Sequence, residues 1–316
     1  MKTPGQKPNH TQGLLHPRNV HLAPYDFPQL IAACPELRSF VQPHRLAGDT
    51  IDFADPVAVL TLNRALLKLH YRINHWEIPS GYLCPPVPSR ADYLHHAADL
   101  LADGGTLPRG SSVRVLDIGV GANCIYPLLG TQIYGWHFVG TDVDPAAVDA
   151  ARRNVAANPG LTEKIECRQQ TSPDTIFKGV VQPGETFALS LCNPPFHSSH
   201  EEAAAGTLRK LRNLGSGPAP AKPVLNFGGR SHELWCEGGE VDFVRRLVAE
   251  SAARPALCLW FTTLVSKAGS LPAVHRALAR VRPTEVRTLA LFAGQKQSRV
   301  VAWTFRGQAA GVSCRS

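Results

Sequence analysis

The distribution of apolar residues predicts strands that alternate with helices over the central and C-terminal parts of the chain. Helical patterns follow the first two strands: one runs from about Ala122 or Asn123 to Leu129, and the other begins at Asp144-Pro145. The apolar runs that are typical of buried strands lie at 113–117, 136–141, 163–169, 186–192, 256–264, 285–292 and 299–305. This alternation favours an α/β fold in which helices cover both faces of a mostly parallel sheet.

The first 88 residues are predicted to form a tail and a small helical module. Residues 1 to about 25 are polar and lack periodicity, so we expect them to be loose and to become ordered only on a partner. The pair Asp55-Pro56 is typical of a helix N-terminus, and apolar residues recur at helical spacing from there to about Tyr71. The sequence therefore predicts one well-defined helix in this part of the chain.

A proline-rich connector separates this module from the rest of the chain. Residues 83–88 include three prolines, which fix φ and favour extended conformations before them, so no helix is expected there. Ser89 and Asp92 stand at the spacing of a capping box and predict that a helix begins at this point. We therefore divide the chain into an N-terminal tail and helical module, 1–88, and a main domain, 89–316.

The composition is that of a globular protein with a basic surface. Apolar residues make up 44% and charged residues 18% of the 316 positions, which suits a buried core. Apolar stretches of membrane-spanning length and a secretory signal are both lacking, so we expect a cytoplasmic protein. The 8 cysteines are scattered without zinc-type spacing, which predicts reduced core thiols and no metal. The net charge of +8 would attract a polyanion but says nothing about specificity.

A glycine-containing turn is the first candidate binding feature. Asp117, Gly119, Gly121 and Cys124 lie where the strand at 113–117 leads into the next helix. Glycines let the backbone approach a ligand and point N–H groups toward it. The third glycine of the dinucleotide pattern is missing, so a compact adenosine ligand is favoured over a pyrophosphate cofactor. A plain tight turn is the alternative interpretation.

Asp142 ends the next strand, about 20 residues beyond the glycine turn, where a carboxylate accepts hydrogen bonds from the ribose hydroxyls of a bound nucleoside. A purely structural interpretation is that Asp142 leads the following helix beside Asp144. Taken together with the glycine turn, Asp142 favours a nucleoside site.

The segment Asn193-Pro194-Pro195-Phe196 follows the strand at 186–192, at the sheet edge where ligands bind in open α/β folds. An Asn oxygen and a proline carbonyl can accept the two N–H bonds of an aromatic amine and aim its lone pair, while the Phe ring stacks on the base. No strong base is needed, because the proton can leave after the amine becomes cationic. These four residues are therefore candidate catalytic residues for methyl transfer. A Pro-Pro loop with an Asn cap is the alternative.

Basic residues beyond this segment are candidate RNA contacts. Residues 197–232 contain a run of Gly and Pro and are predicted to be the least ordered interior stretch. Their positive side chains suit phosphate contacts, unless they form only a solvated face: Arg209, Lys210 and Arg212. A second basic group, which either reaches RNA or forms a simple exposed tail, lies near the N-terminus: His10, His16, Arg18 and His21.

Several long segments closely resemble the bacterial ribosomal RNA large-subunit methyltransferase F family and, more distantly, the eukaryotic methyltransferase-like 16 group. These segments are 84–93, 117–128, 192–197 and 234–240, and the resemblance extends from about residue 15 to 305. It implies a class I methyltransferase fold, Rossmann-like, with a seven-stranded sheet whose last strand is antiparallel. It also implies S-adenosylmethionine as cofactor and N6-methylation of one adenosine in 23S rRNA.

The resemblance further implies that Arg90 holds the methionine carboxylate of the cofactor and that Asn193 lies beside it. The expected partner is 23S rRNA or a large-subunit assembly intermediate, bound by a monomer. One departure concerns the third strand of the main domain, which leads into Gln169-Gln170-Thr171 where class I enzymes commonly carry an Asp at the cofactor adenine. The side chains that contact the adenine are therefore left open.

Two other functions remain open at this point. Asn-Pro-Pro-aromatic segments also serve methylation of glutamine amides in proteins, and DNA adenine is a further acceptor of the same chemistry. A methyltransferase fold could also bind RNA without catalysis. The presence of both Asp142 and the segment that begins at Asn193 argues against a pure binding protein, which has no need of a methyl-transfer geometry.

Overall fold

The computed structural model describes residues 15–44, 48–195, 236, 238–293 and 296–307. Its main feature is a seven-stranded sheet in the order β5-β4-β3-β6-β7-β9-β8. The strands are β3 (Arg114–Ile118), β4 (His137–Asp142), β5 (Ile165–Gln169), β6 (Phe187–Cys192), β7 (Cys258–Val265), β8 (Glu285–Ala293) and β9 (Lys296–Thr304). β9 runs antiparallel to both neighbours, and the other pairs are parallel. The predicted class I methyltransferase fold is thus confirmed.

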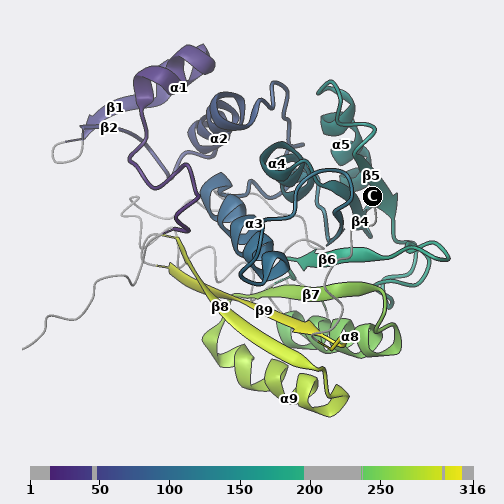
Figure 1. Ribbon diagram of the computed structural model, residues 1–316. Coiled ribbons are helices and arrows are strands. Elements are labelled where there is room, and N and C mark those ends of the chain that lie inside the picture. Colours follow the sequence, from purple (N-terminus) through teal and green to yellow (C-terminus); the bar gives the residue numbers. More distant parts are fainter. Residues whose placement is uncertain (1–14, 45–47, 196–235, 237, 294–295, 308–316) are drawn as a thin grey trace, which may run out of the picture.

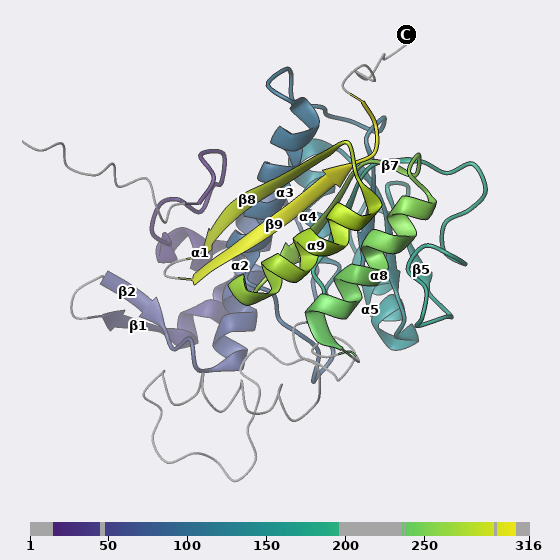
Figure 2. The same cartoon turned by 90° about the horizontal axis from the view of Figure 1, so that it is seen from below.

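Helices cover both faces of this sheet (Figure 1). The helices α3 (Val87–Ala102), α4 (Ile125–Tyr134) and α5 (Pro145–Ala156) lie on one face, and α8 (Gly239–Ala253) and α9 (Leu271–Val281) lie on the other. The alternation of side chains along β3 explains this layering, since Val115 packs into the core shared with α3 and α4 whereas Leu116 packs into the core shared with α8 and α9. Figure 2 shows α8 and α9 side by side across the sheet.

The N-terminal module packs onto the α3 side of the sheet (Figure 1). It consists of α1 (Phe27–Ala33), a 3-10 turn (Pro35–Phe40), the hairpin β1 (Val41–His44) and β2 (Gly48–Ile51), and α2 (Pro56–Tyr71). The predicted start of α2 is confirmed, because Asp55 accepts a hydrogen bond from the N–H of Val57 at 2.8 Å. Leu66 and Leu67 are fully buried in the core that also contains α3 and α4 residues. The domain boundary at residue 88 stays a prediction.

Residues 15–25 are not the loose tail that the sequence predicts. Their polar side chains are tied to α2 and α3, in particular those of His16, Arg18, Asn19 and His21. Asn19 is only 2% exposed. Asp92 of α3 accepts hydrogen bonds from the His16 N–H at 2.6 Å and the Asn19 amide at 3.1 Å. The interpretation of this group as a simple exposed tail is therefore wrong, because His16 and His21 are buried and Arg18 is half-buried. Contact of this group with RNA stays a prediction, and His10 lies outside the described residues.

The helix α3 begins at Val87, two residues before the start that the sequence predicts. Its N-cap is Pro86, and Pro88 occupies the first turn, where a missing N–H costs nothing. Ser89 does not cap the helix, because its hydroxyl donates to the carbonyl of Pro86 at 3.1 Å. Asp92 binds the N-terminal segment instead of a helix N–H. The capping-box prediction is therefore wrong. The prolines are expected only to prevent a helix at 83–88, but Pro86 and Pro88 stand at the start of α3.

The described cysteines are all free, and all but Cys236 are buried, as predicted for core thiols. Within the described ranges, no helix is long and apolar enough to cross a membrane. The same residues contain no group of three or more His, Cys, Asp or Glu side chains placed to hold a metal ion.

Candidate active site

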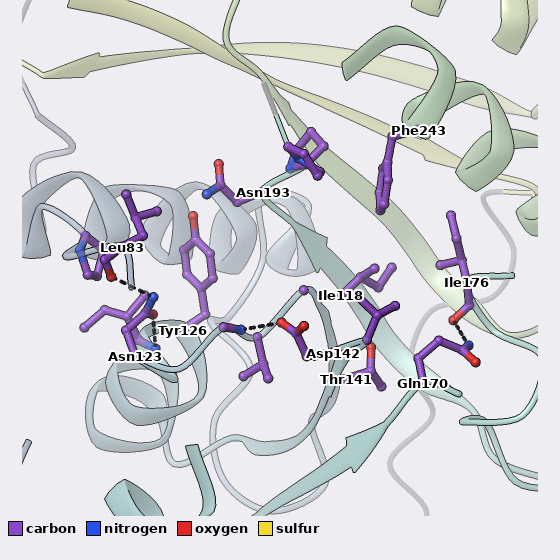
Figure 3. Close-up of a pocket in the computed structure, with 18 of the residues that line it drawn as sticks. Leu83, Ile118, Asn123, Tyr126, Thr141, Asp142, Gln170, Ile176, Asn193 and Phe243 are labelled. Carbon is purple, nitrogen blue, oxygen red and sulfur yellow. Dashed lines mark hydrogen bonds between the residues drawn. The ribbon is translucent and has the colours of Figure 1, made fainter. Parts of the chain in front are cut away.

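A pocket opens at the carboxyl ends of β3, β4 and β6 (Figure 3). The strand order reverses here, because β4 and β5 continue on one side of β3 while β6 and β7 continue on the other. Such a switch point is where open α/β sheets bind ligands. The lining residues come from segments far apart in the sequence and include Arg90, Gly119, Asp142, Gln170, Asn193 and Phe243.

The glycine turn forms part of the pocket wall. Gly119 and Gly121 adopt φ of 76° and 63°, in the left-handed region that favours glycine. A Cβ atom at Gly119 would meet nothing within 4 Å, so the backbone conformation, and not crowding, requires glycine there. The N–H groups of Gly119 and Val120 both donate to the Thr141 carbonyl at 2.9 Å, which joins the turn to the end of β4. The turn thus presents fixed backbone to the pocket.

Asp142 points into the same space (Figure 3). Its Oδ2 accepts a hydrogen bond from the Gly121 N–H at 2.9 Å, and its Oδ1 accepts one from the Asp144 N–H at 3.0 Å. Burial raises the pKa of Asp142, and these backbone hydrogen bonds oppose that shift. Asp144, and not Asp142, caps α5 by accepting from the Ala146 N–H at 2.9 Å. Asp142 therefore lines the pocket rather than serving as the helix cap.

Asp117 lies at the end of β3 and is 1% exposed, and neither carboxylate oxygen has a hydrogen-bond partner among the described residues. Burial, with a contribution from Asp142, raises the pKa of Asp117 to about 8, and Arg90 opposes the shift. Cys124 is fully buried as the N-cap of α4 and lies outside the pocket lining. The Cys124 thiol packs in the core, and a role of Cys124 in cofactor binding stays a prediction.

Asn193, Pro194 and Pro195 leave the end of β6 and line the pocket opposite Asp142. The Asn193 Oδ1 atom is buried and has no hydrogen-bond donor among the residues that the structure describes. Tyr126 of α4 lies beside Asn193 in Figure 3. The segment thus lies at the carboxyl edge of the sheet, as predicted, and it lines the same cavity as the glycine turn. Phe196, Arg209, Lys210 and Arg212 lie outside the described residues.

Gln170 follows β5 directly and lines the pocket, but its amide group is already hydrogen-bonded within the protein. Its amide nitrogen donates to the carbonyls of Ile176 at 3.3 Å and Lys178 at 3.0 Å, and its amide oxygen accepts from the Ser172 N–H at 2.9 Å. The side chain thus holds the loop of residues 172–178 against the sheet. The residue at the usual adenine-binding position is used here to shape the wall.

Further lining residues carry no recognisable sequence pattern. Figure 3 shows Phe243 pointing from α8 into the space that Ile118 and Ile176 also face. Leu83 of the connector lines the opposite end, where its carbonyl accepts from the Asn123 amide at 3.4 Å. A helix and a connector far from the motifs in sequence thus complete the pocket, and only the tertiary fold brings them there.

Comparisons with known proteins agree with this geometry. The model of a family described as RNA methyltransferase matches residues 9–307. Ribosomal RNA large subunit methyltransferase F of Serratia proteamaculans is 53% identical over 293 residues, which cover 92% of this chain and 87% of that protein. The protein of the same name from Yersinia enterocolitica is 55% identical over 293 residues, 92% of this chain and 88% of its own length.

Solved structures of METTL16 share the fold. The catalytic domain of hMettl16, in complex with MAT2A 3′UTR hairpin 1, matches with a TM-score of 0.79 and 29% identity over 93% of this chain and 96% of that one. The N-terminal domain of human METTL16 in complex with SAH matches with a TM-score of 0.73 and 27% identity over 93% and 99% of the two chains. The chain therefore belongs to the RNA methyltransferase family that includes the ribosomal RNA large subunit methyltransferases F.

Proposed function

We propose that this protein transfers the methyl group of S-adenosylmethionine to the N6 amino group of one adenosine in 23S rRNA. The observation that carries the proposal is the Asn193 Oδ1 atom, a buried acceptor that no described residue donates to, at the edge of a pocket whose other half suits a nucleoside. The relatives named for large-subunit ribosomal RNA support the choice of RNA, and the METTL16 structures named for an RNA hairpin and for SAH support the same pair of ligands.

The residues present fit S-adenosylmethionine. Asp142 would accept hydrogen bonds from the ribose hydroxyls, and the turn at Gly119 leaves open space beside its backbone for the ligand. Arg90 would hold the methionine carboxylate. The adenine would lie among three apolar lining side chains, Ile118, Ile176 and Phe243. When bound, this cofactor supplies an electrophilic methyl group on a positively charged sulfur.

The acceptor half of the pocket positions an amine. Asn193 Oδ1 accepts one N–H bond of the adenine amino group, and the carbonyl of Pro194 accepts the other, so the nitrogen lone pair is aimed toward the methyl group. Pro194 and Pro195 fix φ at both positions, which keeps these acceptors in place before the base arrives. The amine becomes cationic as the new N–C bond forms and then loses its proton, so the protein need not supply a strong base.

The class of acceptor is tested by methyl transfer from methyl-labelled S-adenosylmethionine to total RNA, with DNA and a protein extract as parallel acceptors. The proposal predicts label in large-subunit ribosomal RNA and background label in the other two samples. Label in protein glutamine or in DNA would show that the methyl acceptor is protein or DNA and not RNA. Cofactor binding without transfer to any sample, assembly intermediates of the large subunit included, would indicate a protein that binds RNA without catalysis.

A further inference from the structure

Tyr126 carries a buried hydroxyl that the proposed reaction does not use. The residue lies in the first turn of α4, lines the pocket and is 4% exposed. Its hydroxyl has no hydrogen-bond partner among the residues that the structure describes. Burial raises the pKa of Tyr126, so the group stays a neutral O–H donor at neutral pH. A buried donor without an acceptor is unfavourable, which suggests that a ligand brings the acceptor.

The surroundings of this hydroxyl favour an anion. The guanidinium carbon of Arg90 lies 5.7 Å from the centre of the Tyr126 ring, and a guanidinium only donates hydrogen bonds, so it cannot accept the phenol proton. Tyr126 also stands at the N-terminus of α4, the positive end of the helix dipole. One end of the pocket therefore combines a cation, a neutral donor and a helix N-terminus.

The third group at this end of the pocket is the buried carboxyl of Asp117, which would ionise and accept hydrogen bonds when a cation pairs with it. The charge of Arg90 opposes the raised pKa of both Tyr126 and Asp117, so it acts on both groups. Both oxygens of Asp117 are buried and unpaired among the described residues. Donors for an anion beside an acceptor for a cation match an α-amino-acid group, which carries a carboxylate and an ammonium on one carbon.

We propose that the Tyr126 hydroxyl donates a hydrogen bond to the carboxylate of the cofactor's amino-acid portion, beside Arg90. Tyr126 thereby selects an adenosine that carries an amino acid over an adenosine that does not. The inference rests on the proposed cofactor and assigns to Tyr126 a role in specificity that the acceptor chemistry does not require.

Tyr93 offers a matched control. It is also a buried tyrosine, and its ring packs edge-on against Tyr126 with centroids 5.4 Å apart. Its hydroxyl, however, is paired with Thr262 Oγ1 at 2.6 Å, and Thr262 in turn donates to the Ser190 carbonyl at 2.6 Å. Removing the Tyr93 hydroxyl therefore breaks a structural hydrogen bond, whereas the hydroxyl of Tyr126 donates to no acceptor among the described residues and has only the Arg90 side chain as a polar neighbour.

The test compares the wild type with Tyr126→Phe and Tyr93→Phe, using calorimetric binding of S-adenosylhomocysteine and of 5′-methylthioadenosine, which lacks the amino acid. Tyr126→Phe should weaken S-adenosylhomocysteine binding about 10-fold or more, the effect of losing a hydrogen bond to a charged group, and leave 5′-methylthioadenosine binding unchanged. The Tm of ligand-free Tyr126→Phe should not fall. Tyr93→Phe should lower the Tm and leave the ratio of the two affinities unchanged.

Equal losses for both ligands in Tyr126→Phe, or no loss for either, would overturn the inference. A lower ligand-free Tm with an unchanged affinity ratio in that variant would also overturn it, because the hydroxyl would then be structural. If the wild type binds neither ligand, the proposed cofactor fails and the inference fails with it. If the wild type binds both ligands but the ratio of the two affinities is the same in Tyr126→Phe, the inference about Tyr126 fails and the proposed cofactor stands.

Discussion

The backbone on either side of Asn193 fixes its position, and its amide oxygen is the atom proposed to bind the amine. The residue follows β6 directly and precedes two prolines, so its backbone is held on both sides. Its buried Oδ1 atom has no donor among the residues that the structure describes, which is unfavourable for folding and useful only if a ligand brings the donor. We therefore expect Asn193 to act in the reaction rather than in stability.

Replacement of Asn193 by alanine tests this separation. We expect Asn193→Ala to lower methyl transfer by roughly 100-fold or more, because the amine loses an acceptor that orients it, while the Kd for S-adenosylhomocysteine changes by less than about 3-fold. The measurements are single-turnover transfer and calorimetry. Asn74→Ala, at an exposed side chain, is the matched control and should behave as wild type. Full activity in Asn193→Ala would rule out the proposed acceptor geometry.

The raised pKa of Asp117 predicts that the stability of the protein depends on pH. Its pKa of about 8 in the folded protein exceeds the value of about 3.9 for an unfolded aspartate, so the folded state holds a proton that the unfolded state releases over this range. The contribution of this group to stability is therefore fully present below about pH 4 and is lost as the pH rises toward about 8. Asp117→Asn cannot titrate, so it should lack this loss.

Urea unfolding of the wild type and Asp117→Asn at several pH values measures the effect. We compare the free energy of unfolding of Asp117→Asn with that of the wild type at each pH. From about pH 5 to pH 8.5 the variant should gain about 1–3 kcal/mol relative to the wild type, because only the wild type must ionise a buried carboxyl that has no partner among the described residues. The readout is the change of the difference with pH, so a constant offset from the new amide does not affect it. A difference that stays flat over this range would contradict a raised pKa of Asp117.

At the scale of elements, the N-terminal segment 15–25 fixes the first turns of α3, the helix that carries Arg90. Asn19 donates to the Pro88 carbonyl at 2.9 Å and to the buried Asp92 carboxylate at 3.1 Å. Asp92 is fully buried, so each donor that it loses leaves charge without compensation. The segment therefore supports a wall of the active site from outside the pocket.

Asn19→Ala should lower the free energy of unfolding by about 1–3 kcal/mol, because it removes the donor to the Pro88 carbonyl and leaves Asp92 with only the His16 N–H of its two donors. We also expect weaker binding of S-adenosylhomocysteine, by a few-fold, since the turn that carries Arg90 loosens. Denaturant unfolding and calorimetry check the two effects. Gln29→Ala removes an exposed amide that contacts Asp26 and serves as control, with an expected change within about 0.5 kcal/mol. A loss in Asn19→Ala no larger than this would contradict the supporting role of the segment.

The same elements show how far the sequence predicts the structure. The strands are predictable because apolar runs and their spacing are local signals, and the helix start at Asp55 is predictable because the cap and its N–H lie within two residues. The burial of residues 15–25 is not, because the partners of Asn19 lie about 70 residues away and the contacts are polar. The place of Phe243 in the pocket lining is not predictable either, because the other lining residues lie far from it in the sequence.

At the scale of the whole molecule, Asn154 of α5 and Asn158, two residues beyond the end of α5, attach residues 74–77 to the main domain. Asn154 exchanges hydrogen bonds with both backbone groups of Glu77 at 2.8 Å, and Asn158 accepts from the N–H groups of Asn74 and His75 at 2.9 and 3.1 Å. The chain then continues into the connector, where Leu83 lines the pocket. The N-terminal module, connector and sheet thus meet at one site, although the sequence places them far apart.

The same arrangement joins the two halves of the proposed reaction. The half with Asp142 and the glycine turn lies on the β4 side of β3, and the half with Asn193 follows β6 on the other side. Each half is recognisable in the sequence, but only the strand order brings them into one pocket. A donor site and an acceptor site that share a cavity are what direct methyl transfer requires.

The position of the methyl group on the RNA tests the central claim most directly. Large-subunit ribosomal RNA that lacks the modification is incubated with the protein and methyl-labelled S-adenosylmethionine, digested to nucleosides and separated by chromatography. The account predicts label in N6-methyladenosine, at one site, and none with Asn193→Ala. Label in a ribose-methylated nucleoside or in a base methylated on carbon would contradict it, because Asn193 is positioned to hold an exocyclic amine.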